Sequence, residues 1–188
     1  SINGMVYVRG QREDFDHWAA LGNPGWSFSD VLPYFRDCER RIGPGEDAYR
    51  GRAGGLTVVD LNWPSMLNDA FLAACGKNGI PANPDHNGAT QAGSGRYQYN
   101  IDRGWRMSAA RAFLKPALNK ANLKVMTQTL ATAVMMDGLR AVGVRCRGVR
   151  SGETIDIRAR REVILACGSV NTPKLMQLSG LGPAATLQ

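Results

Sequence analysis

The sequence lacks a long apolar run and has few of the residues that mark metal sites. No stretch of 18 consecutive apolar residues occurs, so we expect no membrane-spanning helix. Of its 188 residues only two are histidines, and its four cysteines include no CxxC pair and no histidine at ligand spacing. We therefore predict no metal site, and we expect free, mostly buried thiols from a reducing compartment.

Three common catalytic motifs are also missing. The chain has no GxSxG, no Walker loop and no HExxH, which argues against a serine hydrolase, a P-loop nucleoside triphosphatase and a zinc protease. Residues 180–185 fit GxGxxA letter by letter, but they follow a predicted helix and contain Pro183. A dinucleotide-binding turn follows a strand, so we interpret this match as the end of a helix.

The composition is that of a globular protein with one sizeable core or two small lobes. Hydrophobic residues make up 44% and charged residues 21% of the chain. The net charge of +7 arises from 23 basic and 16 acidic residues, and the arginines are spread along the chain. Six arginines between 145 and 161 alternate with apolar residues, as on the solvated face of strands. We predict no nucleic-acid partner, although a basic nucleic-acid binder remains an alternative.

The first half of the chain is predicted to mix helices, strands and loops. Residues 12–41 are predicted to be helical and exposed, with Ser27 or Ser29 as a helix cap. The glycine- and charge-rich residues 43–55 predict a loop, a candidate lid or lobe boundary. Further along we expect a strand at 56–61, a helix at 65–79, a loop at 80–95, a strand at 96–102 and a helix from 108 that Pro116 disturbs.

From Leu123 the pattern changes to β. Residues 123–136, 140–146 and 153–159 predict a meander, with a turn at Asp137-Gly138. Residues 163–167 are continuously apolar, which is typical of a strand covered on both faces.

A helix is predicted directly after that strand. Thr172 can cap it, Pro173 suits its first position and Gly180 ends it. A helix N-terminus beyond a strand presents backbone N–H groups to a phosphate or an anionic ring edge. An ordinary strand-helix junction explains the same residues equally well.

Five segments, in order, resemble the glucose-methanol-choline (GMC) family of flavin-dependent oxidoreductases. Residues 168–182, "GSVNTPKLMQLSGLG", match the family's second signature, and "SINGMVYVRG" resembles the end of its first. "NPGWSFSDVLPYF", "RMSAARAFL" and "NLKVMTQTLATAV" lie between them. The similarity covers essentially the whole chain and is closest to the choline dehydrogenase and long-chain alcohol dehydrogenase branch.

The resemblance implies an α+β fold, with pieces of an FAD-binding lobe and an antiparallel substrate lobe. It predicts an FAD-proximal segment and lid-like loop at 1–55, substrate-lobe elements at 56–118 and a return to the FAD-binding lobe at 119–188. The family's GxGxxG unit would precede residue 1 and its catalytic histidine would follow residue 188. We therefore expect a fragment that is inactive alone and contains no catalytic residue.

The resemblance also implies a set of FAD-binding positions. Asn3 to Val6 would run beside the isoalloxazine and pyrophosphate, Ala131 would contact the adenine end through its main chain, and the strand end would approach the cofactor at Ala166 and Gly168. The predicted cofactor-binding residues are Asn3, Gly4, Met5, Val6, Ala131, Ala166 and Gly168. Some relatives carry a histidine that attaches to the flavin where this chain has Ile2, so we expect non-covalent FAD.

The implied function is oxidation of a choline-like or other primary alcohol to the aldehyde, with hydride transfer to flavin N5. The electron acceptor would be a quinone, another acceptor or oxygen. A homo-oligomer is possible, and we expect a cytoplasmic protein or one associated with a membrane. The alternative is a non-catalytic, truncated relative that acts as a binding module.

Aromatic residues and histidines offer weaker hypotheses. Trp26, Trp63, Trp105 and Tyr97 could form a cage for a quaternary ammonium group, but ordinary packing is the preferred interpretation. Of Tyr97 and Tyr99 we expect only one to face a substrate. His17 is predicted to lie on the surface, and His86 lies in a turn-like loop; neither is predicted to be catalytic.

Overall fold

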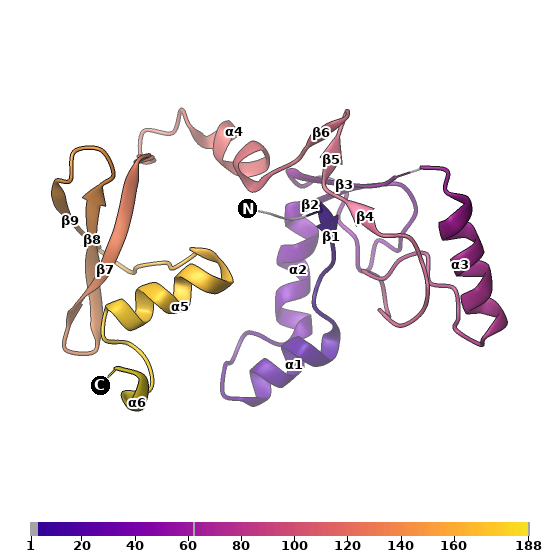
Figure 1. Cartoon of the computed structure of the whole chain (residues 1–188), viewed down its shortest axis with the longest axis horizontal. Coiled ribbons are helices and arrows are strands. Elements are labelled where there is room, and N and C mark those ends of the chain that lie inside the picture. The colour runs from indigo at the N-terminus through magenta and orange to yellow at the C-terminus, as the bar shows by residue number, and fades with distance from the viewer. Residues whose placement is uncertain (1–3, 62, 188) are drawn as a thin grey trace. The chain divides into compact units, whose positions relative to one another are not determined.

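The computed structural model describes residues 4–61 and 63–187, and its chain divides into two compact units. Unit 1 comprises residues 1–123 and unit 2 comprises residues 124–188. Each mixes helices with mainly antiparallel strands, so the predicted α+β class is confirmed (Figure 1). The finer predicted division at residues 55 and 118 stays a prediction. Among the described residues, no helix has the length and apolarity needed to cross a bilayer.

A four-stranded sheet forms the centre of unit 1. Its strand order is β1-β4-β3-β2, in which β2 and β3 run parallel and the other pairs are antiparallel. The strands of unit 1 are β1 (Val6–Tyr7), β2 (Glu39–Ile42), β3 (Leu56–Asp60), β4 (Gln98–Tyr99) and a separate antiparallel pair, β5 (Ile101–Asp102) and β6 (Trp105–Arg106). The predicted strand 96–102 is thus two short strands that meet at Asn100.

Two helices pack together beside this sheet (Figure 1). They are α1 (Arg12–Ala20) and α2 (Phe28–Cys38). Ser27 is the cap of α2, because its hydroxyl accepts from Asp30 N at 3.3 Å while the Asp30 carboxylate accepts from Ser27 N at 3.1 Å. The prediction of helix through residue 41 is wrong at its end, since the chain enters strand β2 at Glu39 and gains partners on β3 there.

Two further helical segments complete unit 1. Helix α3 (Met66–Lys77) begins after Ser65, whose hydroxyl accepts from Asn68 N, and the chain leaves it through Gly79 at a φ of 79°. The predicted helix from Ser108 is present as a π-helical turn, η1 (Ala110–Leu114), followed by α4 (Lys115–Ala117). Pro116 has no N–H to donate to the regular helical hydrogen bonds, and the helix ends one residue later, at Ala117.

The loop at 43–55 is fastened to α2 and β2. Gly54 N donates to Glu39 O at 2.9 Å, and Arg41 N donates to Gly51 O at 2.8 Å. A Cβ at Gly51 would overlap the carbonyl oxygen of Arg36, and one at Gly54 would overlap the backbone of Cys38. The loop therefore lies against α2 and β2 of unit 1, and its role as a lid or lobe boundary stays a prediction.

Unit 2 is a three-stranded antiparallel meander with a helix packed on β7 (Figure 1). Its elements are β7 (Thr129–Asp137), β8 (Arg140–Gly148), β9 (Thr154–Arg158), α5 (Gly168–Leu178) and α6 (Ala184–Leu187). The predicted turn is confirmed, with Gly138 at a φ of 57° and Asp137 paired with Arg140. The predicted β-structure before Thr129 is not formed. Gln128 has a φ of 52°, which an extended strand does not allow, and strand β7 begins only at the next residue.

The apolar segment 163–167 is not a strand in this structure. Its residues are half-buried or exposed, and Ile164 is 79% exposed. An apolar strand of this type needs hydrogen-bonded neighbours on its edges and helices on its faces. Within the ranges the structure describes, no strand pairs with it. The prediction of a doubly covered strand is therefore wrong for this chain.

Helix α5 begins four residues before the predicted cap. It starts at Gly168, and Thr172 lies inside the first turns, where its hydroxyl accepts from Cys167 N at 3.0 Å. Thr172 thus satisfies a backbone donor just ahead of the helix instead of capping it. The predicted end is confirmed: Gly180 has a φ of 76°, and Leu181 N donates to Met176 O at 2.9 Å, as in a Schellman motif.

Candidate functional site

The segment from residue 4 to residue 9 has one side exposed to solvent and one side packed against the rest of unit 1. Gly4, Val6 and Val8 are exposed, whereas Tyr7 is half-buried and Arg9 is buried. The alternation is that of an extended chain with a period of two. Asn3, the first predicted cofactor residue, lies outside the described residues. Gly4 and Val6 thus face open space, as an FAD-facing segment requires.

The backbone of this segment is strained at Met5. Met5 has a φ of 63°, a region that residues with a side chain rarely occupy. Such strain persists only where surrounding contacts hold it, and it occurs disproportionately at ligand sites. A Cβ added at Gly4 would meet only Val6 Cγ2, at an ordinary 3.8 Å, so there is room in front of the turn.

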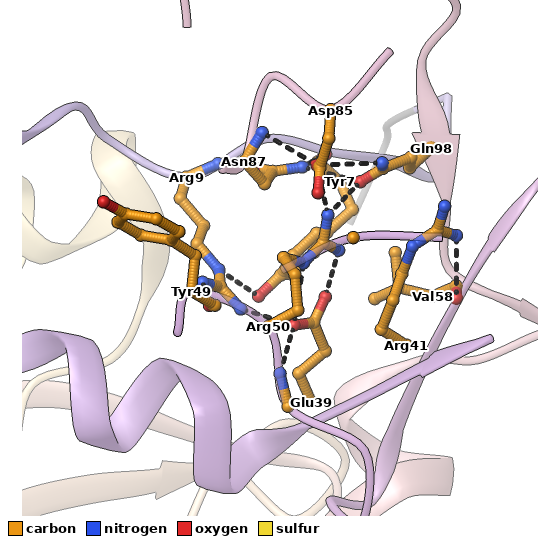
Figure 2. Close-up of polar contacts among 12 residues, drawn as sticks. Tyr7, Arg9, Glu39, Arg41, Tyr49, Arg50, Val58, Asp85, Asn87 and Gln98 are labelled. Atoms are coloured by element: carbon orange, nitrogen blue, oxygen red, sulfur yellow. Dashed lines mark hydrogen bonds and ion pairs between the residues drawn. The ribbon is translucent and has the colours of Figure 1, made fainter. Parts of the chain in front are cut away.

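Behind this segment lies a buried polar cluster (Figure 2). Glu39 accepts from Arg9 Nη2 at 2.6 Å and from Gly51 N at 3.0 Å, and it is bound by Arg50 through both carboxylate oxygens. Arg50 also donates to Asp85 at 2.5 Å and to Gln98 Oε1 at 2.8 Å. The Glu39 and Arg50 side chains are fully buried. Loop 43–55 is therefore anchored through the charge of Arg50.

Charges balance within the cluster. Two guanidinium groups, of Arg9 and Arg50, face two carboxylates, of Glu39 and Asp85. Burial alone would lower the pKa of Arg50, but hydrogen bonds and charge from Glu39 and Asp85 outweigh it and raise that pKa. The pKa of Tyr7 is also raised, in this case by burial of its hydroxyl group. Neither group exchanges protons near neutral pH, so they stabilise the fold without acting as acid or base.

The two histidines differ in environment. His17 is exposed on α1, as predicted. The His86 Nε2 atom is buried and finds no hydrogen-bond partner among the described residues, and its ring packs edge-on against Tyr97 at 5.4 Å. Burial, ahead of all other causes, lowers the pKa of His86. His86 is therefore neutral at pH 7. Its predicted lack of a catalytic role stays a prediction.

The aromatic side chains do not form the four-membered cage that was considered. Trp63 and Tyr97 line one hollow of about 600 Å³, but Trp26 packs on Trp18 at 5.9 Å, and Trp105 lies under the Arg111 guanidinium at 5.4 Å. The four rings therefore do not converge, but the preferred interpretation of ordinary packing is not supported either, because each ring residue is more than half exposed.

The hollow also corrects the expectation for Tyr97 and Tyr99. Both tyrosines line it, because positions two apart on a strand share a face. Arg96 lies in the same wall and donates to Trp63 O at 2.8 Å. The Arg96 guanidinium also pairs with the Asp69 carboxylate.

The predicted residues of unit 2 lie at an edge strand and a helix start. Ala131 is half-buried on β7, directly before a bulge between Ala131 and Ala133. In the described part of the chain no strand other than β8 pairs with β7, so no strand blocks the predicted main-chain contact at Ala131. Ala166 and Gly168 are exposed at the N-terminus of α5.

Gly168 fits a close approach of a cofactor. Its φ of 88° favours glycine, and no atom lies within 4 Å of the place where a Cβ would stand. Because α5 begins at Gly168, its free N–H groups lie beside the predicted residues, closer than the predicted start at Thr172 would place them. The residues present therefore fit an FAD contact.

The buried cluster contains residues that the sequence did not single out. Glu39 and Arg9 are 30 residues apart, and Arg9 and Asn87 are 78 apart. No local pattern reports such pairs. One signal was available: Glu39 and Arg41 alternate within an extended segment, which places both charges on one face of β2.

The whole chain matches a known family. The GMC oxidoreductase family matches residues 1–187. The chain belongs to this family. The resemblance seen in the five segments is thereby confirmed.

Curated relatives of this GMC chain are similar along its full length. It is 47% identical over 188 residues to an oxygen-dependent choline dehydrogenase of Brucella anthropi and 45% identical to one of Rhizobium johnstonii. The alignments cover 100% of this chain and 34% of each relative. The chain therefore spans about a third of the length of these relatives.

Two solved structures of oxidoreducing enzymes are similar to the chain. An FAD-dependent oxidoreductase from Chaetomium thermophilum gives a TM-score of 0.88 at 31% identity, over 99% of this chain and 34% of that one. Pyridoxine 4-oxidase from Mesorbium loti gives 0.86 at 29% identity, over 98% and 36%. These similarities agree with the α+β fold described above.

Proposed function

We propose that this chain is part of an FAD-dependent enzyme that oxidises a primary alcohol, choline-like or other, to the aldehyde. Its membership of the GMC oxidoreductase family supports oxidoreductase chemistry. Relatives at 45–47% identity are choline dehydrogenases, and a structural neighbour is an FAD-dependent oxidoreductase. The electron acceptor would be a quinone, another acceptor or oxygen.

The observation that carries the proposal is the pair of open backbone positions with special conformations. Met5 holds a φ of 63° beside exposed Gly4, and Gly168 holds a φ of 88° at the start of α5. Gly4, Met5 and Val6 would lie beside the flavin ring and pyrophosphate. Gly168 and Ala166 would let the chain approach FAD closely, and Ala131 would contact its adenine end.

The predicted cofactor-binding residues would bind and orient FAD and would not transfer protons. When bound, FAD supplies the hydride acceptor at N5. The free N–H groups at the N-terminus of α5 favour negative charge on the cofactor. Exposed Val6 and Val8 offer apolar contact to a flat ring and exclude water from it. With Ile2 where a covalently attaching histidine would stand, FAD would bind non-covalently.

The test uses the full-length protein. It should purify yellow, with a flavin visible spectrum, and should release FAD on denaturation in acid. Anaerobic addition of choline or a simple primary alcohol should bleach the flavin band. A full-length protein that is colourless and takes up no FAD on reconstitution would contradict the proposal and favour a non-catalytic binding module.

A matched pair of glycine variants sharpens this test. Gly168→Ala forces a side chain into a positive φ at the predicted contact, so flavin occupancy should fall. Gly182→Ala is the control, because Gly182 lies beyond the C-terminal end of α5, where a Cβ meets side chains only at 3.6 Å or more. Its flavin content should equal that of the unsubstituted protein.

A further inference from the structure

The strained segment is held by hydrogen bonds from a distant loop. Strand β1 comprises only Val6 and Tyr7, paired with β4 on one side. Two residues of ladder are too few to fix the chain on both sides of them. Additional bonds do so: Asn100 N donates to Met5 O at 2.8 Å, and Gln91 Nε2 donates to Arg9 O at 2.9 Å.

Asn87 makes the central pair of these bonds (Figure 2). Its Oδ1 accepts from Arg9 N at 2.8 Å, and its Nδ2 donates to Tyr7 O at 3.0 Å. One amide side chain thus pairs with an N–H and a C=O two residues apart, as a neighbouring strand would. Asn87 extends the ladder of β1 beyond the point where β4 stops pairing.

The Asn87 amide is itself fixed in orientation. Only 5% of Asn87 is exposed, and its Nδ2 also donates to Gln98 Oε1 at 2.9 Å. Gln98 Oε1 in turn accepts from Arg50, so the amide is joined to the buried charge cluster. A rigid amide cannot follow a shift of the segment. It therefore transmits the position of the cluster to Tyr7 and Arg9.

We propose that Asn87 is a positioning residue for the cofactor-facing segment 4–9. The inference rests on the proposed function, because it takes Gly4, Met5 and Val6 to lie beside FAD. Asn87 does not touch that open face; it pairs with the main chain behind it. Without it, Arg9 N–H loses its partner in a buried place, and the strained turn at Met5 loses support on its C-terminal side.

The experiment compares three variants of the full-length protein. Asn87→Ala removes both bonds to the segment. Asn87→Asp keeps an acceptor for Arg9 N and loses the donor to Tyr7 O. Asn83→Ala is the matched control, because Asn83 lies in the same loop and bonds to nothing in segment 4–9. Its Nδ2 donates to Thr90 O and Ala92 O, and its Oδ1 accepts from Asp85 N at 3.0 Å.

Amide hydrogen exchange of the flavin-free protein is the first measurement. Asn87→Ala should accelerate exchange at residues 5–9 by about tenfold or more, as expected for loss of a buried hydrogen bond, while exchange in β3 matches that of Asn83→Ala. Asn87→Asp should fall between them. Equal acceleration of segment 4–9 and β3 would mean general destabilisation and would overturn the inference, as would no acceleration.

Flavin binding is the second measurement. The FAD dissociation constant of Asn87→Ala should rise about tenfold or more relative to Asn83→Ala at similar melting temperature. Faster exchange at residues 5–9 with unchanged FAD affinity would overturn the positioning role alone. If the unsubstituted protein takes up no FAD, the proposed function fails, and the cofactor role of Asn87 fails with it. The exchange measurement needs no flavin, so it still shows whether Asn87 holds segment 4–9 in place.

Discussion

The two units differ in what fills their interiors. The largest fully buried side chains of unit 1 include Arg50, Gln98 and Glu39, and they form one hydrogen-bonded cluster. In unit 2 the buried side chains are Val134, Cys146 and Leu175, and the ion pair between Arg145 and Asp156 lies exposed. Unit 1 thus combines apolar contacts with buried, paired charges, whereas the buried side chains in the described part of unit 2 are apolar.

This difference indicates which unit holds its side chains in more strictly defined positions. Apolar contacts are non-directional and tolerate small shifts, whereas buried charges must meet particular partners at hydrogen-bond distance. Breaking a buried pair is costly, because it leaves an uncompensated charge. We therefore expect unit 1 to respond to single isosteric changes more strongly than unit 2.

The largest effect should come from Glu39→Gln. The change keeps the size of the side chain and removes the charge that both Arg9 and Arg50 face. The free energy of unfolding of unit 1 should fall by about 3–5 kcal/mol. Tryptophan fluorescence during urea unfolding measures it, since all four tryptophans lie in unit 1.

Asp156→Asn is the matched control in unit 2. It removes one carboxylate from the exposed pair with Arg145, whose guanidinium lowers the pKa of Asp156. Water and salt screen such a pair, so no measurable change in stability is expected. Equal losses for the two variants would contradict the comparison between the units.

An intermediate effect is expected from Ser179→Ala. The Ser179 hydroxyl accepts from Val134 N at 2.7 Å and donates to Leu175 O at 2.6 Å, so it joins α5 to β7. Its loss should cost about 1 kcal/mol and loosen this contact. The rate at which a thiol reagent modifies buried Cys146 should rise, in a background with the other three cysteines replaced by alanine. Ser169→Ala, at an exposed position of α5, should leave that rate unchanged.

The smallest effect should come from protonation of His86. Burial lowers its pKa below 6.5, so the unfolded chain binds the proton more readily. Unit 1 should therefore lose stability as the pH falls below about 6.5 and regain it as the pH rises. The urea midpoint of tryptophan fluorescence at pH 7.5 and 5.5 measures this.

Two histidine variants isolate the source of the pH dependence. His86→Gln should flatten it, whereas His17→Gln, at an exposed site, should leave it as it is. The charges of Asp85, Arg50 and Arg41 also act on His86, and both variants retain them. A midpoint that falls equally in His86→Gln would assign the effect to other groups.

Features with determinants a few residues apart were predictable from the sequence. The cap at Ser27, the turn at Gly138 and the helix end at Gly180 depend on neighbours within a single turn. The family resemblance likewise pointed to Met5 and Gly168, which both have a positive φ in the structure, and to Gly4, which is exposed. Local sequence therefore predicted most elements and the open faces of the candidate site.

Features that depend on distant partners were not predictable. Segment 163–167 is apolar enough for a strand but has no strand beside it in the described chain. The loop 43–55 is polar enough to suggest mobility, yet Arg50 finds Glu39 and Asp85 and is buried. Asn87 was passed over because its partners are about 80 residues away in sequence.

The tight packing at Gly51 and Gly54 also determines whether the buried ion pair of Arg50 can form, which limits the substitutions that this protein tolerates there. Each lies where a single added methyl group would collide with the backbone at the end of α2. Such a collision would lift the loop and withdraw Arg50 from Glu39, although no charged residue had been altered. A purely steric substitution would thus act as an electrostatic one, and a compensating change would have to restore room for the backbone before any new charge could help.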